Sequence, residues 1–260
     1  MGLRCALAPY HQPDAICQRP PLVLLILEFL SERLSRRLMQ SLLDGIIAAA
    51  RQGRCSCLID TGALITGFTN HEVAEYLLGF GKARRSPEAA AKPALPAEGV
   101  DGVVFLDVHG GKKILLRLTR EASKLADSCV PAQRRFAFYG QVHTTGMDIQ
   151  HKLDAVAALT LGKDMNWRVH EQGAYRMRGI GKGQRICLQV IPQLIELISK
   201  DRRMANIEER LTGDAGRWHR SEGGMLLAVA AWLLVNSIRT KCIQLAMRQV
   251  QNPKNTTWTG

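Results

Sequence analysis

The sequence predicts an α/β protein built around a parallel β-sheet, and three observations lead to this prediction. Short apolar runs of strand type alternate with helical segments between residues 136 and 195. Apolar residues at helical spacing precede this region, over residues 22–51, and follow it to about residue 251. Strands that alternate with helices are typical of right-handed βαβ units, which wind on both sides of a parallel sheet.

The N-terminal part of the chain is expected to be helical and then to enter the sheet. Helical spacing over residues 22–51 predicts one or two helices that cover a sheet. Residues 57–59 predict a short buried strand that ends in the turn 60–62. Thr69 and Glu72 match a capping box, which predicts a helix that continues to about Leu78.

An insertion and a hairpin are predicted next. Residues 81–98 are rich in Ala, Pro, Lys and Arg without an apolar period, so we expect a disordered surface insertion. The strand-like runs 103–106 and 114–118 flank Gly110 and Gly111, which predicts a β-hairpin.

The alternating region supplies the centre of the predicted sheet. A turn containing Gly146 separates its first two strands, and a helix over 167–177 separates the second from the third. Right-handed crossovers predict that the three strands are parallel neighbours: they are residues 136–139, 155–161 and 185–191. A helix starts at Pro192, and the apolar run 225–235 predicts a buried core helix.

These elements predict three regions. Residues 1–56 form a helical N-terminal segment, 57–195 form the α/β lobe with the insertion 81–98, and 196–260 form a helical C-terminal region. The chain of 260 residues is 46% hydrophobic, which suffices for at least one substantial core.

Charge and cysteine content restrict the partners and the compartment. The net charge of +12 favours polyanions, nucleic acid among them, without choosing one. Seven unevenly spaced cysteines indicate reduced thiols and a cytoplasmic protein. Cys55 and Cys57 have no second ligand pair, so no metal site is expected. The longest apolar runs are shorter than the ~20 residues of a membrane span, which predicts no membrane partner.

The first motif that contains candidate catalytic residues is Asp60-Thr61-Gly62. It resembles the Asp-Thr-Gly turn of aspartic proteases, in which two aspartates share a proton and activate water. The chain contains no second such motif. The favoured interpretation is a strand-end turn in which Asp60 binds local backbone N–H groups.

A second group of motifs resembles the last two motifs of superfamily-two helicases and of the SecA translocation ATPase. It comprises a strand, a Gly-x-Asp-Ile turn and a helix that carries Gln-x3-Arg, in residues 136–139, 146–149 and 172–183. The resemblance implies a RecA-like fold, the second lobe of a P-loop NTPase. It assigns Arg176 and Arg178 as arginine fingers and Gly146, Asp148 and Gln172 as nucleotide-coupled residues. Arg178 lies one residue before the place of the second family arginine, which Gly179 occupies.

The sequence lacks one part of an NTPase. No GxxxxGK[ST] loop is present to hold the phosphates of ATP. The isolated chain is therefore expected to bind no cofactor, and ATP would require a first lobe that the chain does not contain.

Longer strings resemble the C-terminal region of very large protist and fungal proteins labelled ubiquitinyl hydrolases. They are residues 58–67, 102–107, 141–149, 160–165 and 173–184. The resemblance implies a fragment of a larger polypeptide, a thiol isopeptidase activity and ubiquitin or its conjugates as partner. Cys129 and His143 are the only pair that we would name for a thiol–imidazole dyad.

The chain departs from this family at two positions, and two classes of function stay open. Gly140 stands where the family usually has Asp, and His170 replaces an aromatic residue. The first class is an enzyme part that acts in ubiquitin removal or nucleotide-driven remodelling. The second is a non-catalytic lobe that binds another lobe, nucleic acid or a protein.

Overall fold

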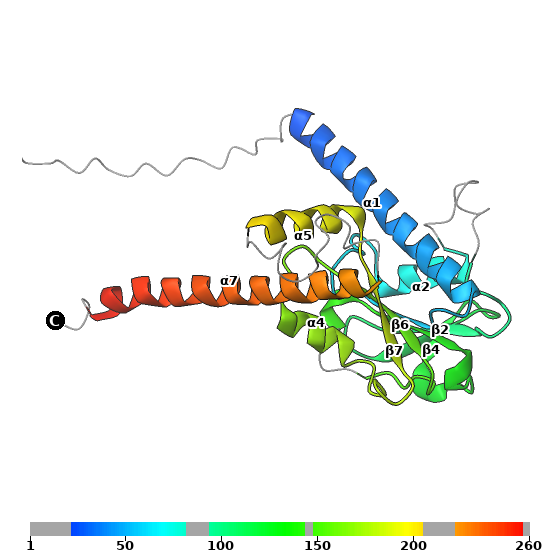
Figure 1. Cartoon of the computed structure of the whole chain (residues 1–260). Coiled ribbons are helices and arrows are strands. Elements are labelled where there is room, and N and C mark those ends of the chain that lie inside the picture. The colour runs from blue at the N-terminus through cyan, green and yellow to red at the C-terminus, as the bar shows by residue number, and fades with distance from the viewer. Residues whose placement is uncertain (1–21, 82–93, 144–147, 205–221, 257–260) are drawn as a thin grey trace, which may run out of the picture.

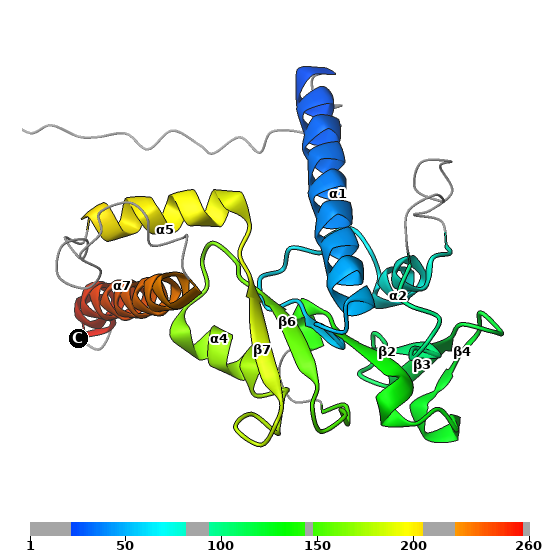
Figure 2. The same cartoon turned by 45° about the vertical axis from the view of Figure 1, so that its right-hand side comes forward.

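A computed structural model describes residues 22–81, 94–143, 148–204 and 222–256, and its core is a seven-stranded sheet with helices on both faces (Figures 1 and 2). The helices are α1 (Leu22–Arg51), α2 (Asn70–Leu78), α4 (Trp167–Ala174), α5 (Pro192–Met204) and α7 (Glu222–Thr256). The strands are β1 (Cys57–Ile59), β2 (Gly102–Leu106), β3 (Lys112–Leu116), β4 (Ala122–Lys124), β5 (Arg135–Tyr139), β6 (Val156–Thr160) and β7 (Arg185–Gln189).

The predicted α/β class is confirmed by the strand arrangement. The order in the sheet is β4-β3-β2-β5-β1-β6-β7, and the five strands from β2 to β7 in that order are parallel. Strand β3 pairs antiparallel with β2, as the hairpin pattern predicted, and β4, which was not predicted, pairs antiparallel with β3 at the edge of the sheet.

One part of the predicted pairing is wrong. Strands β6 and β7 are parallel neighbours, but β5 and β6 are separated by β1, which pairs with both. Strand β1 has only three residues, and all three are fully buried. Because a short strand that is buried on both faces has little sequence pattern beyond its apolar residues, its central position is hard to predict.

The sheet winds in two directions from β1. Leu58 and Phe138 face the core cluster beneath α1 and α2, whereas Ile59 and Tyr139 face the opposite cluster. The chain from β1 passes through α2 to β2 on the first face. The connection from β5 to β6 carries Ile149 into the cluster on the second face, where α5 and α7 also pack against β6. The loop after β1 thus leaves the sheet on the first face, and the loops after its neighbours β5 and β6 leave on the second.

The insertion predicted for residues 81–98 ends earlier than expected. Leu95 is buried in the cluster beneath α2, and its N–H donates to the carbonyl of Leu77. Two adjacent apolar residues between two prolines give no period, so the sequence did not reveal this contact. Residues 82–93 of the insertion lie outside the described residues.

Candidate functional site: a crevice at the carboxyl ends of the parallel strands

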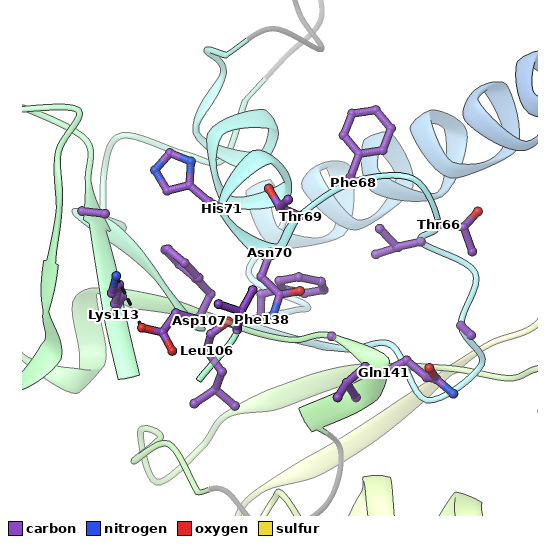
Figure 3. A pocket seen from close by; sticks show the side chains of 17 residues that line it. Thr66, Phe68, Thr69, Asn70, His71, Leu106, Asp107, Lys113, Phe138 and Gln141 are labelled. Atoms are coloured by element: carbon purple, nitrogen blue, oxygen red, sulfur yellow. Dashed lines mark hydrogen bonds and ion pairs between the residues drawn. The ribbon is translucent and has the colours of Figure 1, made fainter. Parts of the chain in front are cut away.

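Two cavities open at the carboxyl edge of the sheet, on either side of the end of β1. The first, of about 520 Å³, lies between the start of α2 and the ends of β2 and β5, and we call it the α2 cavity (Figure 3). The second, of about 800 Å³, lies between the ends of β1 and β6 and the start of α5, and we call it the β6 cavity. Ala63 and Gln141 line both. Ligands of doubly wound sheets bind in such a crevice, where neighbouring loops leave on opposite faces.

Asp60 holds the loop that separates the two cavities. Its carboxylate accepts hydrogen bonds from the N–H groups of Leu64 and Ile65, each at 3.0 Å, and from the Thr160 hydroxyl at 2.7 Å. Burial raises the pKa of the Asp60 carboxyl, and the hydrogen bond from Thr160 is the largest effect that opposes this rise. All these partners belong to the fold, so Asp60 is a strand-end turn residue, as the favoured interpretation of the sequence stated.

Gly62 allows the loops after β1 and β6 to touch. Its N–H donates to the Thr160 hydroxyl at 2.9 Å. A Cβ atom at position 62 would lie 2.6 Å from the carbonyl carbon of Leu161. Because that neighbour is backbone, a side chain at this position would force the two loops apart.

The start of α2 forms one wall of the α2 cavity. Thr69 and Glu72 make the predicted capping box, with the Thr69 hydroxyl accepting from the Glu72 N–H. Asn70 follows, and its side-chain amide donates to the Leu106 carbonyl at 2.7 Å. Figure 3 shows Asn70 between the ends of β2 and β5. The cap thus fixes a polar amide at the bottom of the crevice.

Gly140 makes room for this amide. A Cβ atom at position 140 would lie 2.4 Å from the side-chain oxygen of Asn70. With Asn70 in this position, an aspartate side chain could not occupy position 140. Gly140 therefore contributes to the shape of the crevice.

The wall of the α2 cavity is mainly apolar, with a compensated charge at its rim. Phe105 and Phe138 line it from β2 and β5. Asp107 and Lys113 form an ion pair of 3.4 Å at its edge, drawn as a dashed line in Figure 3. The Asp107 carboxylate also accepts from the N–H groups of His109 and Gly111. The arrangement suits a compact ligand with an apolar body and a few hydrogen-bonding groups.

The two predicted arginine fingers bind the same carboxylate and do not line either cavity. Arg176 and Arg178 lie in the turn after α4, and both donate to the Asp148 carboxylate at 2.8 Å. The Arg176 side chain is only 8% exposed, so it does not face an open surface as expected for a finger. Gln172 is half-buried within α4, and Gly146 lies outside the described residues.

Of the thiol–imidazole pair, the structure describes only the Cys129 side chain. Cys129 is exposed in the segment that precedes β5, where no described residue hydrogen-bonds to it. The backbone of His143 ends the turn after β5, and its side chain lies outside the description. Burial raises the pKa of the Cys55 thiol to about 11 and also raises the pKa of the Cys57 thiol well above its ordinary value, which keeps both thiols protonated and unreactive. The described residues contain no group of three or more potential metal ligands.

Sequence reasoning missed the residues that shape the crevice. Asn70 and the segment from Thr160 to Gly162 come from two distant parts of the chain, and the sheet brings them to one edge. The capping box was the only local signal for this wall. Comparison with known proteins adds no assignment, because no family model, curated protein or solved structure matches this chain.

Proposed function

We propose that the chain is a non-catalytic RecA-like lobe that binds a compact heteroaromatic ligand of the nucleoside class in the α2 cavity. The observation that carries this proposal is the crevice itself: a cavity of nucleoside size at the carboxyl ends of parallel strands, beside the strand from which the sheet winds in both directions. The parallel order with helices on both faces supports the RecA-like part of the proposal.

The lining selects the chemistry of the ligand. Phe105 and Phe138 offer an apolar, aromatic wall, and Asn70 and Gln141 supply amide groups. At the rim, the charges of Asp107 and Lys113 compensate each other. A heteroaromatic base matches this combination, because its faces are apolar and its edge forms hydrogen bonds.

The triphosphate of ATP does not fit the described residues. The Glu72 carboxylate accepts from the N–H and hydroxyl of Thr69 and so places negative charge at the start of α2. A helix start normally attracts phosphate, and this carboxylate opposes that attraction. Arg176 and Arg178 are bound to Asp148, and the phosphate-binding loop is absent from the sequence. No hydrolytic step follows from this geometry, which is why we propose a binding lobe.

Adenosine is the probe for this proposal. Titration of the 260-residue chain with adenosine, followed by isothermal calorimetry and by NMR, should show one saturable site of weak affinity. Gln141→Ala removes an exposed amide from the cavity wall, and we expect a Kd about fivefold higher, the effect of one lost hydrogen bond. ATP should not be hydrolysed.

Gln150→Ala is the matched control, because Gln150 is an exposed glutamine that lines neither of the two cavities. Its Kd for adenosine should equal that of the parent chain. Absence of a saturable signal with adenosine, guanosine and uridine would rule out the nucleoside assignment. Steady turnover of ATP that is lost in Arg176→Ala would rule out the non-catalytic lobe.

The ubiquitinyl-hydrolase activity stays a prediction from resemblance, and a separate test addresses it. Ubiquitin that carries a C-terminal vinyl sulfone reacts with activated thiols. Because Cys129 lacks a described hydrogen-bond partner, we expect no adduct. An adduct that disappears in Cys129→Ala and persists in Cys242→Ala, at another exposed thiol, would establish a thiol enzyme and contradict our proposal.

A further inference from the structure

The C-terminal half of α7 leaves the body of the protein. Figure 1 shows the helix running past the sheet and its neighbouring helices. Its last described contacts with the body are made around Asn236, which donates to the Met165 carbonyl, and Arg239, which pairs with Asp201 at 3.0 Å. All side chains from residue 238 to residue 249 are exposed.

This projecting half carries a broad apolar surface. Leu234, Ile238 and Leu245 are 51%, 62% and 59% exposed. An α-helix turns by about 100° per residue, so these three side chains fall within an arc of roughly 40°. Ile243 and Met247 are similarly exposed and lie on the opposite side. The arc between the two lines holds Cys242 and Ala246 together with the polar Arg239 and Gln249. Two lines of apolar side chains are therefore in contact with water, and Leu234, Ile238 and Leu245 form the first.

The remaining arc is basic. Lys241, Gln244 and Arg248 occupy it. The sequence from Gly223 to Gln249 contains no Asp or Glu, and the whole chain has a net charge of +12. An apolar face beside a Lys/Arg-bearing polar face is the pattern of a helix that lies in the interface of an anionic membrane.

The packing of the first half of α7 against the body of the protein favours binding at a membrane surface over a membrane span. By length and composition, Gly223–Gln249 could cross a membrane, a test that core helices of soluble proteins also pass. Ala228, Val229, Trp232 and Leu233, however, are buried against β6 and α5. Spanning a bilayer would remove these side chains from the core, whereas lying on its surface leaves them in place.

We infer that the end of α7, residues 238–249, binds the surface of an anionic lipid bilayer through Ile238, Leu245 and the neighbouring basic residues. The expectation of no membrane partner rested on the length of uninterrupted apolar runs. A surface helix needs no such run, because its polar residues stay in water. Pairing with a second copy of α7 is disfavoured, since each helix presents cations without any carboxylate to meet them.

Vesicle co-sedimentation of the 260-residue chain tests the inference. Vesicles of phosphatidylcholine with one quarter phosphatidylserine should sediment the protein, and pure phosphatidylcholine vesicles should sediment much less. The double variant Ile238→Ser/Leu245→Ser should bind at least about tenfold more weakly, because it removes apolar burial without touching the core. The double variant Lys241→Gln/Arg248→Gln should bind more weakly and lose most of the salt dependence.

Leu118→Ser is the matched control, because Leu118 is 97% exposed on the body of the protein, far from α7 in the sequence. Its sedimentation should equal that of the parent chain. Equal sedimentation of the parent chain and the Ile238/Leu245 variant, or none with anionic vesicles, overturns the inference. Analytical ultracentrifugation without vesicles tests the alternative occupant, a second copy of the chain. A dimer that the Ile238/Leu245 variant abolishes would assign this face to that second copy and overturn the inference.

Discussion

Replacing Trp232 with alanine should lower the free energy of unfolding by about 3–5 kcal/mol, the usual cost of removing a large buried aromatic side chain. Trp232 is 1% exposed and belongs to the cluster that joins β6, α5 and α7. Its indole N–H donates to the Asp201 carboxylate at 3.1 Å, and Asp201 also pairs with Arg239. The substitution removes both the packing and one partner of a nearly buried carboxylate.

Urea unfolding followed by circular dichroism measures this loss. Leu234→Ala, two residues along the same helix, is the matched control, because Leu234 is half exposed and should cost less than about 1 kcal/mol. Trp232→Phe retains an aromatic side chain and loses the hydrogen bond, so an intermediate cost is expected. Equal, small effects of the three variants would mean that α7 is not packed against the sheet as described.

The elements that could be predicted from sequence are those with a local signal. The capping box at Thr69 and Glu72 specified the start of α2, because two side chains three residues apart satisfy each other's backbone groups. The β2–β3 hairpin followed from two apolar runs around Gly110 and Gly111. Strand and helix alternation identified β5, β6 and β7 and their parallel direction.

The order of strands and the state of the arginines depend on distant contacts. Strand β1 lies between β5 and β6 because its side chains complete the cores on both faces, and no local pattern encodes that position. The helicase resemblance assigned Arg176 and Arg178 as arginine fingers. It could not show that the Asp148 carboxylate, about thirty residues earlier, binds both.

The crevice was predictable only as a general location. The carboxyl edge of a parallel sheet is where ligands are expected, and the sequence placed Asp60 there at the end of β1. Its detailed shape comes from the close approach of Asn70 to Gly140 and of Gly62 to Leu161. These pairs are separated by seventy residues or more, so only the folded sheet reveals them.

The second large effect expected is a loss of stability in acid that depends on His151. This histidine is half-buried, and its Nε2 lies 3.2 Å from the Tyr139 hydroxyl. Burial lowers the pKa of His151 to about 4, although the Asp148 carboxylate partly opposes the change. An unfolded histidine has a pKa of about 6.5. Between these two values the unfolded chain binds more protons than the folded chain.

The free energy of unfolding should therefore fall as the pH decreases from 6.5 towards 4, by about 3 kcal/mol from this residue, and the full contribution is present above pH 6.5. Asp60 acts in the opposite direction, because its raised pKa stabilises the fold as its carboxyl takes up a proton. His151→Gln separates the two, since glutamine keeps an acceptor near Tyr139 without titrating. Urea unfolding at pH 7.0 and 4.5 should show a much smaller loss in this variant than in the parent chain. If both lose the same amount, His151 is protonated in the folded protein and does not cause the acid sensitivity.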